Sequence, residues 1–412
     1  MSFFNEIKAV LMGLLLSILC SCMWETSPTD YLPLDDSLYP YAQLPRLVVE
    51  TSDFQEARNT EDYVEGALQF YGAKGPESDV MTMSIRGRGN SSFTSPKFSY
   101  RIKLQEKASL LEMPRDKDWL LIPNYMDKSL LRNFITAKMA RENLGFWTPR
   151  SEFVELYVNR TYQGVYQLSE KIEIAKNRLN LPEETFLVEI DHKYKKDDVV
   201  VFSKHSVPFR IHSPKDPSDE ALRAMEARIN DFESFLEDGK YNFDSLGCWV
   251  DVNSYIRYYW MQELSKNVDG AFKTSVFFTW NGSGPMVMGP LWDFDIAYGA
   301  VYSSSPTGWL VRNKYWNADL FRNKKFAAVV RDYWRSHRDE FAAIADSVVY
   351  YGRELAPAAK NNFARWPILG EKNLLSSSLE SFASHKDAVF FLQRWMKSRI
   401  KWIDEQYRWG AF

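Results

Sequence analysis

Cysteine is scarce in this chain of 412 residues, which contains Cys20, Cys22 and Cys248 only. If the chain is processed near its first two cysteines, Cys248 has no internal partner, and a disulfide-stabilised domain is excluded. Histidine is almost as rare, and its five positions show neither metal-ligand spacing nor a partner serine motif. We therefore expect no zinc site and no Ser-His-Asp triad from His192, His205, His212, His337 and His385.

An excess of charge of either sign is also missing. Lysine and arginine total 51 against 54 aspartates and glutamates, and the net charge of -3 provides no field for steering nucleic acid. Hydrophobic residues make up 45% of the chain and aromatic residues 15%, which is typical of a folded globular protein. A length of 412 residues favours two lobes packed around a cleft, and we expect a monomer.

One apolar run stands near the N-terminus. Residues 9–19 (AVLMGLLLSIL) follow Lys8 and are too few to span a bilayer, so they predict a signal peptide. The run ends in Leu-Cys-Ser-Cys at residues 19–22, which resembles a bacterial lipobox. We take Cys22 as the acylated residue, with Cys20 as the alternative; a plain secretory signal with incidental cysteines is the other interpretation. The expected location is the cell envelope, on its periplasmic face or the cell surface.

The chain divides into three parts by composition. Residues 1–21 form the predicted signal peptide, and residues 22–45 are rich in Pro, Ser, Thr, Asp and Tyr without a period, as in a flexible tether. Residues 46–412 form the predicted folded domain.

Strand periods dominate the first half of that domain and helical periods the second. Alternation over residues 83–88 and 97–104 predicts a hairpin with Phe98, Tyr100, Ile102 and Leu104 on its buried face. We predict further strands at 153–158 and 161–168, joined by a tight Asn159-Arg160 turn, and at 186–190, 199–202, 274–280 and 285–292. We predict one helix from Asp127, as N-cap, through Met139, with Gly145 placed to end it, and others at 252–266, 326–341 and 389–407. The order predicts an α+β fold with a sheet-rich first lobe.

Two groups of carboxylates are candidates for chemistry. Asp293 and Asp295 are spaced i, i+2 at the end of a predicted strand, so both should point to one face, where Mg²⁺ would relieve their repulsion. Asp269 follows a predicted helix in the sequence Asn-Val-Asp-Gly at 267–270, and the glycine permits a close approach. Taken alone, either group also fits a capping or turn carboxylate.

A series of motifs in one order resembles the CotH (spore coat protein H) kinase family, in a lipoprotein-type bacterial form. They are RGRGNSS at 86–92, PKFSYRIK at 96–103, NYMDKS at 124–129 with Arg132-Asn133, TPR at 148–150, GVY at 164–166 with EKI at 170–172, NVDG at 267–270 and GPLWDFD at 289–295. The resemblance implies an atypical two-lobed protein-kinase-like fold, with a sheet-rich N-lobe at about 46–172 and a mainly helical C-lobe at about 173–412. It also implies transfer of the γ-phosphoryl group of ATP to Ser or Thr of partner proteins.

The resemblance assigns roles to particular residues. Asp269 corresponds to the catalytic-loop carboxylate that orients the acceptor hydroxyl, Asp293 to the metal-binding acid, and Asp295 assists it in holding Mg²⁺ or Mn²⁺. The cations of the first hairpin then face the nucleotide phosphates, in the order of preference Lys103, Arg88, Lys97. Residues 170–172, from Glu170 to Ile172, resemble a hinge whose backbone bonds an adenine.

Two departures from a typical kinase keep other functions open. Thr274 stands where the second metal-binding Asn is usual, and residues 86–90 do not read GxGxxG. The alternatives are a catalytically degenerate surface or adhesion module and a carboxylate-pair hydrolase of glycans, with tryptophans and tyrosines stacking on sugars.

The lipobox generates a test of localisation. We expect Cys22→Ala to release the protein from the membrane fraction or to leave the signal uncleaved, because the acylated thiol is then lost. Detergent partitioning and N-terminal mass measure this, with Cys248→Ala as the matched control. Unchanged partitioning and processing of Cys22→Ala would contradict the assignment.

Overall fold

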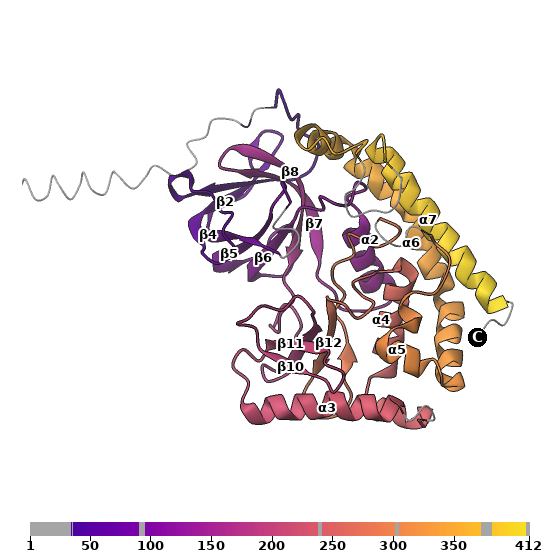
Figure 1. Cartoon of the computed structure of the whole chain (residues 1–412). Coiled ribbons are helices and arrows are strands. Elements are labelled where there is room, and N and C mark those ends of the chain that lie inside the picture. Colours follow the sequence, from indigo (N-terminus) through magenta and orange to yellow (C-terminus); the bar gives the residue numbers. More distant parts are fainter. Residues whose placement is uncertain are drawn as a thin grey trace, which may run out of the picture.

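The computed structural model describes residues 34, 36–89, 95–237, 241–300, 305–371 and 381–408. The predicted signal peptide with Cys20 and Cys22 lies outside these residues. Figure 1 shows a β-barrel beside a second, smaller sheet, with long helices along one side of both. Within the described ranges, none of the helices combines the length and the apolar character needed to cross a membrane.

A closed barrel forms the first part of the chain. Its seven strands follow the order β1-β7-β8-β6-β5-β4-β2, and β1 closes the ring by pairing with β7 in parallel and with β2 antiparallel. The short β3 (Gly75–Pro76) extends β2. The strands are β1 (Arg46–Thr51), β2 (Val64–Gly72), β4 (Met81–Arg88), β5 (Ser99–Ala108), β6 (Asp116–Ile122), β7 (Ser151–Val158) and β8 (Thr161–Glu170).

The alternation of β4 and β5 fills the barrel. Ile85 pairs with Ile102 and Met83 with Leu104, and all four side chains are buried in one cluster with Trp119. Polar residues of the same strands point outward. The hairpin predicted from the period of two is confirmed, whereas the closure into a barrel was not predicted, because strand order depends on contacts between distant segments.

The predicted turn between β7 and β8 is also confirmed. Asn159 and Arg160 both have left-handed backbones, with φ of 48° and 65°, as a two-residue hairpin requires. The Asn159 side chain accepts a hydrogen bond from the Thr51 amide at 2.9 Å, which ties the turn to β1.

A second sheet lies in the later part of the chain, which is therefore less purely helical than predicted. Its five antiparallel strands follow the order β10-β11-β9-β12-β13. They are β9 (Phe186–Ile190), β10 (Val200–Phe202), β11 (Pro208–Ser213), β12 (Val276–Trp280) and β13 (Val287–Met288). The helices nearby are α3 (Asp219–Glu237), α4 (Val252–Ser265) and α5 (Tyr315–Leu320), with short 3₁₀ segments at Phe243–Cys248 and Val311–Asn313. A further turn, at Ser52–Phe54, follows β1 of the barrel.

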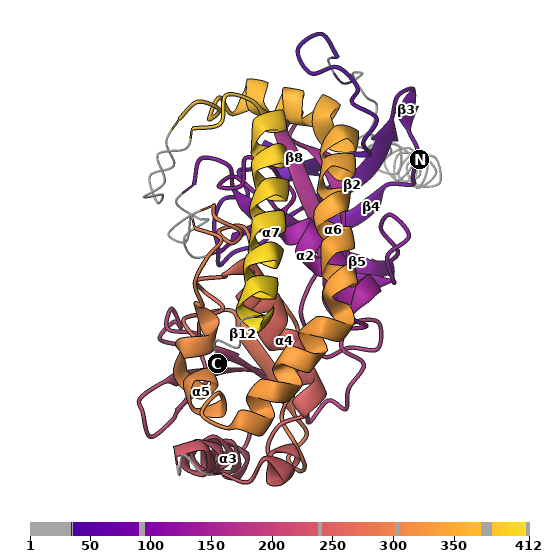
Figure 2. The same ribbon diagram turned by 90° about the vertical axis from the view of Figure 1, so that its right-hand side faces the viewer.

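Two long helices run along the barrel and the second sheet, as Figure 2 shows. They are α6 (Lys324–Arg365) and α7 (His385–Arg408), which pack on each other, and α6 also packs on β8. The predicted helix 326–341 is confirmed, but the observed helix continues to Arg365, well beyond the predicted end. Buried apolar residues such as Val348, Leu355 and Phe363 continue its stripe, so packing carries the helix through Pro357.

Helix α2 (Arg132–Lys138) begins five residues after its predicted N-cap. Asp127 nevertheless serves the helix, since its Oδ2 accepts a hydrogen bond from the Arg132 amide at 2.8 Å. Its Oδ1 accepts from the Ser129 amide at 2.9 Å and pairs with the Arg132 guanidinium. A π-turn (Met139–Asn143) follows, and Gly145 then adopts a φ of 57°.

Part of the segment predicted as a tether contacts the folded domain. Tyr39 stacks on Tyr162 with ring centroids 4.2 Å apart, and the Pro40 carbonyl accepts a hydrogen bond from Asn361 Nδ2 of α6 at 2.7 Å. Residues 36–45 therefore pack against the barrel and α6.

A buried ion pair fixes α4 to α7. Arg399 donates to Glu263 Oε1 at 2.7 Å, and both side chains have no exposed area. Glu263 also accepts hydrogen bonds from the amides of Leu310 and Arg312, at 2.9 and 2.6 Å. The pair thus holds the chain before α5 against the helix that leads into Asp269.

We expect Arg399→Met to lower the free energy of unfolding by about 3–5 kcal/mol, because it leaves the Glu263 carboxylate buried without its cation. Equilibrium denaturation measures the loss. The control is Arg338→Met, whose pair with Asp404 involves a 41% exposed arginine side chain and should cost less than about 1 kcal/mol. Equal losses in the two variants would contradict the role of the buried pair.

Candidate active site

The loop after α4 presents Asp269. The helix ends at Lys266, whose backbone is left-handed with φ of 47°. The Asp269 carbonyl accepts hydrogen bonds from the amides of Lys273 and Thr274, at 3.0 and 3.2 Å, which closes a tight turn. A Cβ on Gly270 would lie 1.9 Å from Gln262 Oε1, so the glycine allows the buried glutamine side chain to approach the loop closely.

Asn267 joins this loop to the one that carries Asp293. Its side chain accepts a hydrogen bond from the Asp269 amide at 3.2 Å and donates to the Asp293 carbonyl at 3.1 Å. The residue is fully buried. Because both contacts are to backbone atoms, Asn267 sets the separation of the two loops without using either carboxylate.

Asp293 was predicted to lie at the end of a strand. The structure instead places it in an irregular loop. β13 ends at Met288, and Asp293 adopts a φ of 67°, a strained conformation for a residue with a side chain. Asn133 Oδ1 accepts a hydrogen bond from the Phe294 amide at 2.7 Å, and the Phe294 ring is buried. Ser275 Oγ donates to Asp293 Oδ2 at 3.3 Å. These contacts hold the strained loop in place.

The carboxylates of the two loops repel one another. Burial, and then the charges of Asp293, Asp127 and Asp269, raise the pKa of Asp295 well above its usual range. Burial also raises the pKa of Asp293, although Arg88 and Lys193 oppose the rise. The ionised form of both carboxylates is therefore unfavourable without further positive charge beside them.

This charge imbalance fits a hard divalent cation. Asp293 and Asp295 lie within hydrogen-bonding range of each other, although they do not extend from a strand. Across the ranges that the structure describes, no three acidic, histidine or cysteine side chains form a ready metal site. Mg²⁺ usually binds proteins through one or two carboxylates, with water and substrate phosphates as the other ligands, so the pair is a sufficient protein contribution.

Arg88 is the predicted phosphate-binding residue that the structure brings to the carboxylates. It is the last residue of β4, it is half-buried, and its guanidinium lies 5.7 Å from the ring centroid of Trp292. Burial lowers the pKa of Arg88, and Asp293 raises it, so the two charges act on each other across the junction of barrel and loop. A cation at this position faces any anion bound beside Asp293.

Lys97, by contrast, is used inside the protein. Its ammonium is buried and donates to the carbonyls of Pro123 and Val165, at 2.7 and 2.5 Å, and to Asn362 Oδ1 at 2.8 Å. These three bonds use all its donors, and burial lowers the pKa of Lys97 well below its usual range. Lys97 joins β8 to α6 and has no donor left for a phosphate.

Lys103 lies away from the carboxylates. Arg88 pairs with Ser99 in the β4–β5 register, and Lys103 stands four residues further along the same strand, exposed on the outer face. At about 3.4 Å per residue, this places it roughly 14 Å from the end of β4 that carries Arg88. The sequence period placed Lys103 and Arg88 on one face but did not show which end of the hairpin meets the site.

Glu170 is a buried carboxylate among arginines. It has no exposed side-chain area and pairs with Arg150 at 3.0 Å, Arg178 at 3.2 Å and Arg141 at 3.7 Å. Its backbone amide donates to the Arg150 carbonyl at 3.0 Å. That amide is therefore engaged within the barrel, and Ile172 follows two residues later, half-buried, where the chain leaves β8.

Several residues at the site were missed from the sequence. Asp191, at the end of β9, accepts a hydrogen bond from Thr274 Oγ1 at 2.9 Å, and Glu189 accepts from the Ser275 amide at 3.1 Å. Thr274 is thus turned toward β9. The acidic pattern of residues 189 and 191 was visible, but it reads as an ordinary strand end until β9 is paired with β12.

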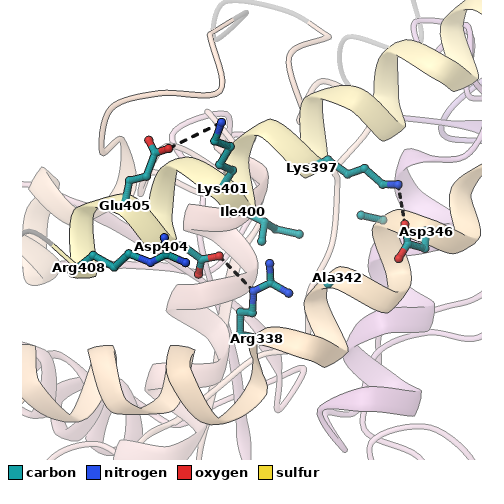
Figure 3. Close-up of a pocket in the computed structure, with 10 residues that line it drawn as sticks. Arg338, Ala342, Asp346, Lys397, Ile400, Lys401, Asp404, Glu405 and Arg408 are labelled. Atoms are coloured by element: carbon teal, nitrogen blue, oxygen red, sulfur yellow. Dashed lines mark hydrogen bonds and ion pairs between the residues drawn. The ribbon is translucent and has the colours of Figure 1, made fainter.

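A groove of about 470 Å³ lies elsewhere, between α6 and α7 (Figure 3). The charges that line it are largely paired, in the pairs Arg338–Asp404, Lys397–Asp346 and Lys401–Glu405. Asp269, Asp293 and Asp295 do not line this groove.

The fold and the site define a mixed α and β protein in which a carboxylate pair and a third aspartate face each other across two loops, with an arginine of the barrel beside them. The chain belongs to the CotH kinase family: the family model for the CotH kinase protein matches residues 85–403, more than half of the chain. A comparison with curated proteins finds no match.

We expect Asp293→Asn to weaken Mn²⁺ binding by about tenfold or more, because an amide is a poorer ligand than a carboxylate. Stability should not fall, since asparagine tolerates the left-handed backbone and the change removes a repulsive charge. Calorimetric titration with Mn²⁺ and thermal melting measure both effects. Asp244→Asn, at a 69% exposed side chain, is the control. Equal Mn²⁺ affinity in Asp293→Asn and the parent would refute the metal role.

Proposed function

We propose that the protein transfers the γ-phosphoryl group of ATP to Ser or Thr hydroxyls of partner proteins. The observation that carries this proposal is the fixed pairing of two loops, in which Asn267 holds the backbone of Asp269 and of Asp293. Phosphoryl transfer is catalysed mainly by positioning and by neutralising charge. The bridge through Asn267 supplies positioning, and Arg88 with a bound divalent cation would supply the neutralisation. Membership of the CotH kinase family supports the same reaction.

The reaction assigns one task to each group. Asp269 accepts the proton of the acceptor hydroxyl while the hydroxyl oxygen bonds to the γ-phosphorus. The bond between that phosphorus and the β–γ bridging oxygen breaks, and ADP is released. Arg88 faces the phosphates from the barrel. Asp293 and Asp295 would hold Mg²⁺ or Mn²⁺, which supplies neutralisation of phosphate charge when bound. In this proposal the barrel serves as the N-lobe of a kinase-like fold, and the second sheet with its helices serves as the C-lobe.

The electrostatics of Asp269 suit a proton acceptor. Burial and the neighbouring Asp293 raise its pKa, while Lys193 and Lys273 lower it. A carboxylate with a raised pKa binds a proton more readily and is a better base once ionised. The same shift means that Asp269 becomes protonated, and inactive as a base, at a higher pH than an ordinary aspartate.

We also propose that the protein acts outside the cytoplasm, anchored through an acylated Cys22, on exported or surface proteins. The support is the signal-like segment and lipobox of residues 9–22. The proposal requires that ATP is present in the cell envelope, or that the protein uses ATP before it is exported.

One observation favours a non-catalytic binding module as the second candidate. Thr274 donates to Asp191 and offers no second amide ligand to a metal. Incubating residues 36–412 with labelled ATP and Mg²⁺ or Mn²⁺ separates the candidates. Label incorporated into the protein or an acceptor supports the kinase, whereas nucleotide binding without transfer supports the module.

We expect Asp269→Asn to bind ATP comparably to the parent and to transfer phosphate on the order of a hundredfold more slowly, as for loss of a general base. Its melting temperature should change by only a few degrees. In the parent, the rate should fall as pH decreases through a pKa above the usual value of about 3.9. Full activity in Asp269→Asn would remove Asp269 from the mechanism, and a large loss of stability would identify it as a structural turn residue.

A further inference from the structure

Lys193 is an exposed cation that the fold places beside the two aspartates. It lies three residues after the end of β9, in the connection to β10. Its backbone amide donates to Asp191 Oδ1 at 2.8 Å, and the same oxygen accepts from Thr274 Oγ1 at 2.9 Å. Asp191 therefore binds the Lys193 backbone to the segment that closes the Asp269 turn.

A second contact reinforces this placement. The amide of His192 donates to the carbonyl of Lys273 at 3.1 Å, and the amide of Lys273 donates to the carbonyl of Asp269 at 3.0 Å. Lys193 is thus connected to the Asp269 turn through two routes, one by the side chains of Asp191 and Thr274 and one by backbone groups. Neither route uses the lysine side chain.

The ammonium of Lys193 remains available for a ligand. Among the residues that the structure describes, its side chain makes no hydrogen bond or ion pair, in contrast with the fully bonded Lys97. Its charge nevertheless lowers the pKa of both Asp269 and Asp293. The side chain is exposed, and its charge acts on both carboxylates.

We infer that Lys193 binds the phosphoryl group that is transferred, as a cation supplied by the second sheet opposite Arg88 of the barrel. This inference rests on the proposed function. The γ-phosphoryl group must lie between the base Asp269 and the metal-binding Asp293, and its equatorial oxygens carry negative charge that positive groups stabilise. Lysine suits this position because its ammonium is a compact point charge on a flexible stem.

The inference predicts an effect that depends on the number of phosphates. We expect Lys193→Ala to bind ATP about tenfold more weakly than the parent, with ADP affinity changed less than about twofold, because a charge-assisted hydrogen bond to the γ-phosphate is lost. Lys193→Arg should restore most of the ATP affinity. Lys196→Ala, at another exposed lysine of the same connection, is the control. The variants should fold, since the lysine side chain makes none of the contacts that fix the segment.

Calorimetric titration of ATP and ADP with Mn²⁺, for the parent and the three variants, is the experiment. Equal loss for ATP and ADP in Lys193→Ala, no loss for ATP, or an equal effect of Lys196→Ala would overturn the role of Lys193 and leave the proposed function standing. A parent that binds neither nucleotide would overturn both. If the parent transfers no phosphate but Lys193→Ala still weakens ATP binding more than ADP binding, the role of Lys193 would be supported. Only the proposed phosphoryl transfer would then be contradicted.

Discussion

The side chain of Asn267 is the contact on which the geometry of the site depends. Its carboxamide bonds to the Asp269 amide and to the Asp293 carbonyl, so one buried residue sets the distance between two loops far apart in the sequence. The strained backbone of Asp293 is stable only because such contacts surround it. Asn133, reaching from α2 to the Phe294 amide, holds the same loop from the barrel side.

Charge is the second constraint. Asp295 is buried, and the charges of Asp293, Asp127 and Asp269 also act on it, so its pKa is raised well above its usual range. A protein alone gains no stability from such a group, so the arrangement costs folding energy that ligand binding can recover. The cations that oppose the rise in the pKa of Asp293 come from both parts of the fold, Arg88 from the barrel and Lys193 from the connection after β9.

Buried charge elsewhere has a structural role. Lys97 makes three hydrogen bonds, two to carbonyls of the barrel region and one to α6. Glu170, at the end of β8, forms ion pairs with three arginines. On the sequence, both belong to motifs that suggest contact with a nucleotide. Residue type and strand period do not distinguish a lysine that binds a ligand from one that binds carbonyl groups, because the difference lies in what packs over it.

The sequence by itself determined the local elements and the chemistry of the candidate residues. The period of two gave the β4–β5 hairpin, the residues Asn159 and Arg160 gave the β7–β8 turn, and the ordered motifs gave the family, since these signals depend on neighbours along the chain. Only the tertiary structure decided the barrel closure, the length of α6 and the membership of the site. Asp191 and Lys193 lie near the Asp269 turn because β9 pairs with β12. Lys97 does not belong to the site, because α6 covers it. Such pairings are long-range contacts, whose partners no local pattern specifies.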